Sequence, residues 1–114
     1  MSTADEQYDR GMDLFAEDRF DEAIAALREA VALNADHADA YHALAMTYSQ
    51  VRRHDEAIAA ARRLVELKPE DTLSHTTLSM IYQRAGRIEE AEAAGAQATG
   101  FRPPPKPPLP WEPE

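Results

Sequence analysis

The sequence predicts an all-α protein, a solenoid of three helix-turn-helix repeats with six antiparallel helices. Two observations lead to this prediction. The sequence aligns with itself three times at a spacing of 34 residues, and a fixed period of this length is typical of solenoid arrays. Within each unit the apolar residues recur at helical spacing, as in the stripe formed by Tyr41, Leu44, Ala45 and Tyr48. At 114 residues, 44% of them hydrophobic, the chain is long enough for one compact domain.

The repeat register is clearest in an acidic motif followed by small or apolar residues. Asp21-Glu22-Ala23-Ile24 aligns with Asp55-Glu56-Ala57-Ile58 and with Glu89-Glu90-Ala91-Glu92. Other equivalent positions hold Gly11, Ala45 and Ser79; Met12, Met46 and Met80; Leu14, Tyr48 and Tyr82; and Leu33, Leu67 and Phe101. The small residues are expected where the two helices of a unit cross closely, because a larger side chain would hold the backbones apart.

Turn residues divide the chain into six segments. Glu17-Asp18-Arg19, Arg52-Arg53-His54 and Ala85-Gly86-Arg87 interrupt the helical pattern within the units. Asn34-Ala35-Asp36 and Lys68-Pro69-Glu70-Asp71 separate one unit from the next, and Pro69 cannot continue a helix interior. Helices are therefore expected at residues 5–17, 20–33, 38–51, 54–67, 72–85 and 88–99. Asp36 and Asp71 (or Thr72) are the expected N-caps.

These residues resemble the tetratricopeptide repeat family, whose unit is a helix-turn-helix of about 34 residues. The second unit is the best copy, and its residues at family positions are Tyr41, Leu44, Ala45, Tyr48, Ala57, Leu64 and Pro69. The resemblance covers residues 4 to about 103 and implies a right-handed α-solenoid. It divides the chain into an N-terminal lead (1–3), three repeats (4–37, 38–71 and 72–102) and a proline-rich tail (103–114).

The two ends of the array depart from the best copy. Gln7 and Arg10 stand where the second unit has Tyr41 and Leu44, and Gly95 and Thr99 stand where the first unit has larger apolar residues. Polar or small residues suit an edge on which nothing stacks. The expectation is a complete array of three repeats.

In the resembled family the first helix of each unit lines a concave groove that binds peptides. Carried over in register, this surface comprises Asp5, Tyr8, Asp9, Met12, Phe15, Asp39, His42, Ala43, Met46, Ser49, Leu73, Thr76, Thr77, Met80 and Gln83. Methionine recurs at one position of every unit, and its flexible, polarisable side chain suits a surface that accepts varied apolar ligands. The alternative is that the three methionines only fill gaps between helices.

Many members of the family grip an acidic C-terminal peptide with a carboxylate clamp of lysine, asparagine and arginine side chains. The matching positions here are Tyr8, Met12, Ala43, Leu73 and Thr77. None of these residues is basic or an asparagine, and the nearby Asp5, Asp9 and Asp39 would repel a carboxylate. The expected ligand is therefore a protein or peptide with apolar anchors and at least one Lys or Arg.

Charge excludes two classes of partner. The net charge is −9, and ten acidic and three basic side chains give residues 4–37 alone a charge of −7. This end of the chain would repel a phosphate backbone or an anionic membrane, so neither nucleic acid nor a membrane is expected as partner. The basic pairs Arg52-Arg53 and Arg62-Arg63 are expected on the convex face, where Asp55 and Glu66 are their expected ion-pair partners.

Catalytic and metal chemistry find no support. The chain has no cysteine, and its four histidines have no partners at metal-ligand spacing. Asp39, His42 and Ser49 fall on one helical face and imitate a catalytic triad, but no glycine-rich turn supplies an oxyanion hole. We expect no catalytic residue, no cofactor and no metal. Without a secretory signal or an apolar run of about 20 residues, the expected location is the cytoplasm.

The tail holds seven of the eight prolines and is expected to form an extended polyproline II segment. Residues 102–108 resemble ligands of SH3 domains and residues 107–110 one class of WW ligand; a stiff terminus without a partner is the other alternative. Trp111 is the sole tryptophan. With Phe101 and Leu109 it is expected to dock the tail on helical surface, of the same copy or of a neighbour.

The expected function is a protein–protein interaction scaffold or adaptor that binds a peptide segment of a partner in the concave groove, without catalysis. The alternative is a self-associating structural module whose proline-rich tail docks in a neighbouring copy. Such a module would form a homo-oligomer through its tail or through the ends of the array.

Overall fold

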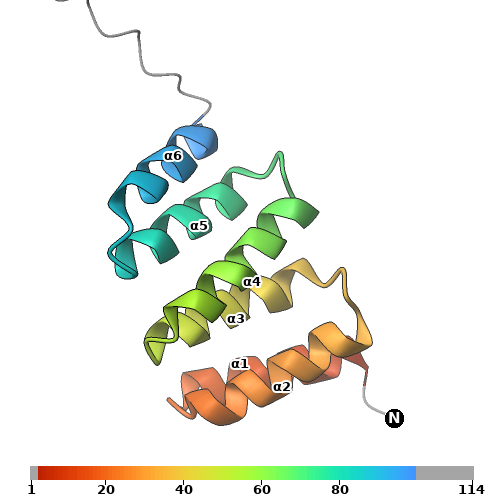
Figure 1. Cartoon of the computed structure of the whole chain (residues 1–114). Coiled ribbons are helices and arrows are strands. Elements are labelled where there is room, and N and C mark those ends of the chain that lie inside the picture. Colours follow the sequence, from red (N-terminus) through yellow and green to blue (C-terminus); the bar gives the residue numbers. More distant parts are fainter. Residues whose placement is uncertain (1–2, 100–114) are drawn as a thin grey trace, which may run out of the picture.

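The structure is a computed structural model that describes residues 3–99, in which six α-helices form three antiparallel hairpins (Figure 1). The helices are α1 (Ala4–Ala16), α2 (Phe20–Leu33), α3 (Ala38–Gln50), α4 (His54–Leu67), α5 (Thr72–Arg84) and α6 (Ile88–Thr99). Each hairpin packs on the next, through α2 with α3 and through α4 with α5. The predicted all-α solenoid of three helix-turn-helix repeats is confirmed.

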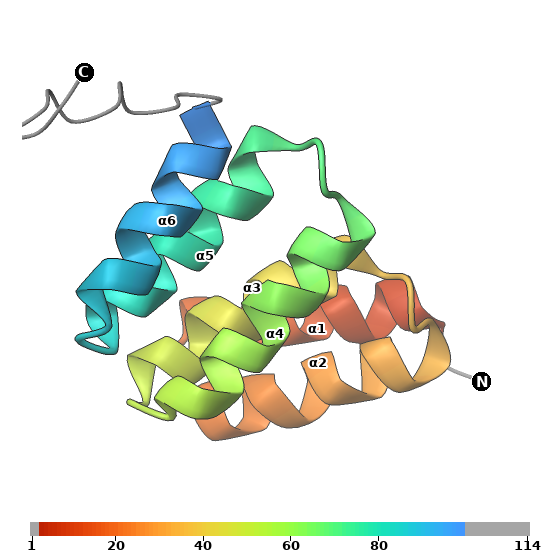
Figure 2. The same cartoon turned by 45° about the horizontal axis from the view of Figure 1, so that its top comes forward.

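The hairpins build two layers. Both views look onto α2, α4 and α6, with α1, α3 and α5 behind them (Figure 1, Figure 2). In one layer α1 contacts α3 and α3 contacts α5. In the other layer, within residues 3–99, α2 does not contact α4 and α4 does not contact α6. Closer spacing in one layer makes that layer the inner, concave one. The inner face is therefore built from the first helix of every repeat.

Close helix crossings depend on a small residue on at least one of the two helices. A Cβ added to Gly11 would lie 2.6 Å from Cγ of Leu27, a side chain that is fully buried in the core. In the third repeat a Cβ added to Gly95 would lie 3.3 Å from Oγ of Ser79. Gly11 and Ser79 thus stand at the predicted crossings, and the space that each leaves is matched to the residue opposite it.

The turn inside each repeat contains one residue in the left-handed region, always at the same register position. These residues are Asp18 (φ 60°), Arg52 (φ 62°) and Gly86 (φ 79°). The preceding residues, such as Val51, are already C-caps, so α1, α3 and α5 end one residue earlier than predicted. Only glycine adopts this conformation without steric strain, and only the third turn has it.

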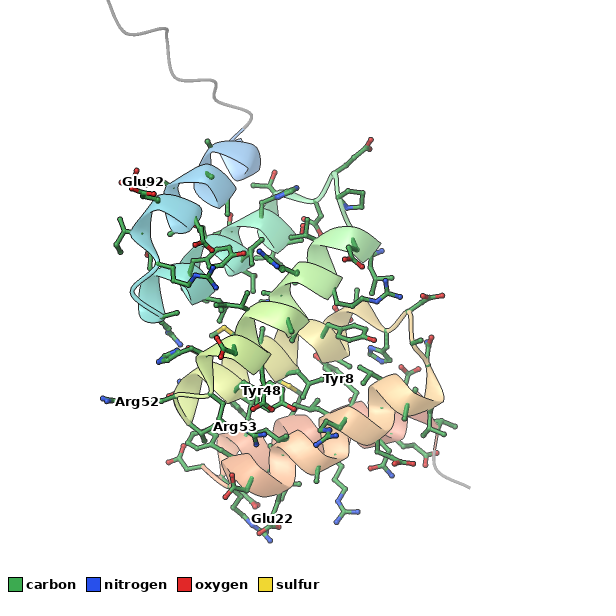
Figure 3. All side chains as sticks on the ribbon, in the orientation of Figure 1. Tyr8, Glu22, Tyr48, Arg52, Arg53 and Glu92 are labelled. Atoms are coloured by element: carbon green, nitrogen blue, oxygen red, sulfur yellow. The ribbon has the colours of Figure 1, made fainter. Side chains whose placement is uncertain are left out.

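This register gives a prediction for stability. Arg52→Gly should raise the free energy of unfolding by about 0.5–1 kcal/mol, because the relief of left-handed strain exceeds the extra entropy of the unfolded chain. Arg52 is exposed and points away from the helices (Figure 3), so little packing is lost. Gly86→Ala, the matched reverse change, should lower the free energy of unfolding by about 1 kcal/mol. Urea unfolding would contradict this account if Arg52→Gly were the less stable protein.

The helix N-caps agree with prediction at one of the two expected positions. The side chain of Asp71 accepts a hydrogen bond from the backbone N–H of Leu73 (3.0 Å), as expected. The prediction for Asp36 is wrong, because α3 is capped by His37, whose Nδ1 accepts from the N–H of Ala40 (3.1 Å). Asp36 instead directs its own N–H to the side chain of Asn34.

The second helix of every repeat starts with an ion pair. In register these pairs are Arg19–Glu22, Arg53–Glu56 and Arg87–Glu90. The expected pairing of Arg63 with Glu66 is present (Nη1–Oε2 3.0 Å), but Arg53 pairs with Glu56 and not with Asp55. A residue at the cap position faces the side chain three residues on, which explains the difference.

The structure bears on membrane crossing but not on the tail, because it describes residues 3–99. Among residues 3–99 no helix combines the length and the apolarity needed to cross a membrane. The predicted tail (103–114), with its expected anchors Phe101, Leu109 and Trp111, lies outside the described residues.

Candidate functional site

The inner face contains an apolar pocket between α1 and α3. Its lining residues are Met12, Phe15, His42, Ala43 and Met46, and its volume is about 220 Å³. Met12 is 38% exposed, while Phe15 and Met46 are half-buried. Four of the five lining side chains are apolar, so the pocket suits one large apolar side chain of a ligand. All five residues belong to the surface that the family resemblance implied.

The three equivalent methionines do not share one environment. Met12 and Met46 line the pocket, whereas Met80 on α5 is half-buried and lies outside it. The structure therefore brings two of the three together at the first inter-repeat junction.

A second, smaller pocket of about 100 Å³ opens between α3 and α5. Its lining includes Asp39, His42, Lys68 and Leu73, and Leu73 is 59% exposed. His42 lines both pockets, and its Nδ1 lies 3.1 Å from Oγ1 of Thr77. This contact between α3 and α5 holds the imidazole on the ridge between the two pockets.

A buried histidine connects α1 to the start of α3. The ring of His37 lies against the ring of Tyr8, with centroids 5.1 Å apart, and its Nε2 lies 2.8 Å from Oδ1 of Asp5. Because Nδ1 accepts from the N–H of Ala40, the ring proton is on Nε2, which donates to Asp5. The contact places Asp5 beside Tyr8, at the N-terminal edge of the inner face.

Tyr8 reports the electrostatics of this edge. Its pKa is raised above the ordinary value of 10.0, first by burial of the phenol and then by the negative charges of Asp39 and Asp9. Both carboxylates are exposed. They come from different helices, so the negative potential spans the junction between the first two repeats. A cationic group of a ligand would be attracted to this edge.

The raised pKa gives a second prediction. Asp39→Asn should lower the pKa of Tyr8 towards 10, because it removes the larger of the two charge effects while burial persists. Since the folded pKa lies above the unfolded one, the associated stability is complete below pH 10 and is lost as the pH rises further. NMR of the Tyr8 ring during an alkaline titration measures the shift. Asp21→Asn, an exposed acid on α2, serves as control and should leave the pKa unchanged.

The residues that imitate a catalytic triad are not connected. Ser49 is buried, and its Oγ lies 3.4 Å from Nη1 of Arg84, while His42 contacts Thr77. Among the described residues no hydrogen bond joins Asp39, His42 and Ser49 to one another, and no group of acidic or histidine side chains could hold a metal ion. Asp39, His42 and Ser49 therefore lack the mutual contacts of a catalytic triad.

The remaining predicted groove residues lie on α5, beside a basic residue that the sequence argument missed. Thr76 and Gln83 are exposed, and Thr77 is buried under His42. Arg84 reaches across to Ser49 of α3 and brings positive charge to this side of α5. Its signal in the sequence is weak, because the equivalent position of the second repeat is Gln50. The face is thus acidic at α1 and the start of α3, and basic at the end of α5.

A wider hollow, of about 600 Å³, opens on the outer side between α4 and α6. Val65, Leu78 and Tyr82 contribute to its lining. His75 also lines it, at the position where the second repeat has the larger Tyr41, and its Nε2 lies 2.6 Å from the carbonyl oxygen of Pro69. The smaller ring at position 75 is the sequence signal for this hollow.

Comparison with protein families yields one match, a family model described as tetratricopeptide repeat, over residues 14–81. Comparison with curated proteins finds no match. These 68 residues, from the end of α1 to the end of α5, include both inner-face pockets apart from Met12.

Solved structures share the fold. A crystal structure of MamA is 32% identical, with a TM-score of 0.80; the match covers 86% of this chain and 57% of that one, so the chain spans little more than half of MamA. The second TPR of Spaghetti (RPAP3), bound to the HSP90 peptide SRMEEVD, is 19% identical with a TM-score of 0.79, over 89% of this chain and 94% of that one. The CopN–Scc3 complex gives 20% identity and a TM-score of 0.77, over 83% and 56%.

Proposed function

Because the chain belongs to the tetratricopeptide repeat family, we propose that it is a non-catalytic interaction scaffold whose inner face binds a peptide segment of another protein. One observation carries this proposal. The apolar pocket of Met12, Phe15, His42, Ala43 and Met46 opens on the concave face. Beside it lies an acidic rim formed by the exposed carboxylates of Asp9 and Asp39. A pocket with nearby charge provides both an anchor and a means of selecting the ligand.

The charge of the rim selects the class of ligand. Burial raises the pKa of Tyr8 most, and the negative charges of Asp39 and Asp9 raise it further, so a ligand gains from bringing a Lys or Arg to this edge. The pocket accepts one large apolar side chain in the same ligand. The proposed partner is therefore a peptide with an apolar anchor and basic residues.

A comparison with the solved complexes sharpens the proposal. The RPAP3 repeat domain was solved with an acidic HSP90 peptide, and the CopN–Scc3 structure is of a protein complex. Protein or peptide ligands are thus accommodated on this fold. The acidic rim here supports a ligand of the opposite charge to SRMEEVD.

Two peptides test the charge assignment. The acidic probe is SRMEEVD. The basic probe is SRMKKVL, in which lysine replaces both glutamates and leucine replaces the C-terminal aspartate. Calorimetric titration should give a Kd for SRMKKVL at least about tenfold lower, a difference of about 1.4 kcal/mol. Tighter binding of SRMEEVD would overturn the charge assignment, and failure of both peptides at millimolar concentration would count against the pocket as a peptide site.

The proposal includes two further elements. The repeats are assigned to residues 4–37, 38–71 and 72–102, and limited proteolysis should cut at their ends before it cuts within them. A cytoplasmic location fits a chain without cysteine, and cell fractionation tests it.

A further inference from the structure

We propose that the inner face is occupied, when no partner is bound, by the C-terminal segment of the same chain, residues 100–114. This inference rests on the proposed function of the groove and names its resident ligand. The segment carries Arg102 and Lys106, followed by Leu109 and Trp111, and its two acidic residues, Glu112 and Glu114, come only after the tryptophan. Basic residues together with a large apolar side chain are the chemistry that the acidic rim and the apolar pocket require.

The order of these residues matches the order of the site. The helices α5 and α6 are antiparallel, so α6 ends at Thr99 beside the N-terminal end of α5 (Figure 1). From that edge a chain crossing the inner face first meets the exposed Leu73 and Asp39, and then the pocket between α3 and α1. In the segment, likewise, Arg102 and Lys106 precede Leu109 and Trp111.

The segment is long enough to reach the pocket. Neighbouring helices pack about 10 Å apart, so the path from α6 past α5 to the α1–α3 pocket is about 30 Å. An extended proline-rich chain advances about 3.1 Å per residue, and the twelve residues from Thr99 to Trp111 therefore span about 37 Å. Lys106, seven residues after Thr99, reaches about 22 Å, which corresponds to the position of α3 and its Asp39.

Docking within one copy has a functional consequence. A peptide from another protein must displace the segment, and its apparent Kd rises in inverse proportion to the fraction of open grooves. An extended proline-rich segment loses little conformational entropy when it binds, so a few contacts suffice to hold it. The C-terminal segment then sets a threshold of affinity that a true partner must exceed.

The sole tryptophan provides the first test, in the full chain. Trp111 emission should be blue-shifted and should not depend on protein concentration. Met46→Glu, in the pocket, should shift the emission to the red, whereas Glu92→Lys on the exposed side of α6 (Figure 3) should not. Trp111 emission at the wavelength of a solvent-exposed tryptophan in the unmodified chain would overturn the proposal. A blue shift that disappears on dilution would also overturn it, because it would place the segment in a second copy.

Charge reversal tests the rim. Arg102→Glu with Lys106→Glu should shift Trp111 emission to the red. Adding Asp9→Lys and Asp39→Lys to that variant should restore the blue shift, because both halves of each attraction are exchanged. If the fourfold variant stays red-shifted while its circular dichroism remains helical, the segment does not lie against these carboxylates.

Competition separates this inference from the proposed function. Trp111→Ala should bind the peptide SRMKKVL at least about tenfold more tightly than the unmodified chain, as expected if nine of ten grooves are closed. Equal binding by both chains would overturn docking of the segment and leave the peptide site standing. Trp111 emission could instead be blue-shifted in the unmodified chain while neither that chain nor Trp111→Ala binds the peptide. This result would support docking and contradict the proposed function.

Discussion

Replacing Met12 and Met46 together with glutamate should weaken binding of a basic-apolar peptide such as SRMKKVL at least about a hundredfold. The two side chains line one pocket of about 220 Å³ from adjacent helices. A glutamate there would have to be buried against the ligand's apolar anchor, and desolvation of a charged group costs several kcal/mol. A hundredfold loss of affinity is about 2.7 kcal/mol, which is within this range. Calorimetric titration of the Trp111→Ala background gives the measurement without competition from the C-terminal segment.

Met80→Glu is the matched control. Met80 occupies the same repeat position but does not line the pocket, so its replacement should change the affinity less than about threefold. Circular dichroism and urea unfolding must show that every variant stays folded. Met12, at 38% exposure, provides the single variant that least disturbs packing. If Met80→Glu abolished binding and Met12→Glu did not, the ligand would lie between the second and third repeats.

Leu27→Ala should lower the free energy of unfolding by about 3 kcal/mol. Leu27 is fully buried, and no other side chain in this crossing can fill the cavity because the opposite residue is Gly11. A domain of this size has only several kcal/mol of stability in total. Urea unfolding followed by circular dichroism measures the loss.

The double variant Gly11→Ala with Leu27→Ala should recover about 1 kcal/mol or more of that loss. The added methyl enters the space vacated by Leu27 and reproduces the pairing of Ala45 with Ala61 at the same register of the second repeat. Gly11→Ala alone should destabilise, because its Cβ would lie 2.6 Å from Cγ of Leu27. Ala25→Gly, at an exposed position of α2, measures the propensity effect alone. Strict additivity of the two single changes would show that they do not share one crossing.

The sequence determined the architecture because a repeat protein encodes its fold in local, periodic terms. The 34-residue period, the apolar stripes and the turn residues place six helices whose ends differ by at most one residue from those predicted. The same register identified Gly11 and Ser79 as close crossings. Each of these inferences compares a residue only with its neighbours or with its equivalents one period away. The assignment of the first helix of each repeat to the inner face came instead from the resemblance to the tetratricopeptide repeat family, and the packing of the helices agrees with it.

Tertiary structure alone decided what the inner face offers. It joined Met12 to Met46 without Met80, placed His37 between Tyr8 and Asp5, and brought Arg84 to Ser49. Each of these contacts joins one hairpin to the next, since His37 caps α3, so they depend on how far one hairpin turns and shifts against its neighbour. That displacement is the sum of many packing interactions along each junction, and identical register positions therefore have different surroundings in successive repeats. A period in the sequence fixes which residues are equivalent, whereas the packing between hairpins fixes which of them meet.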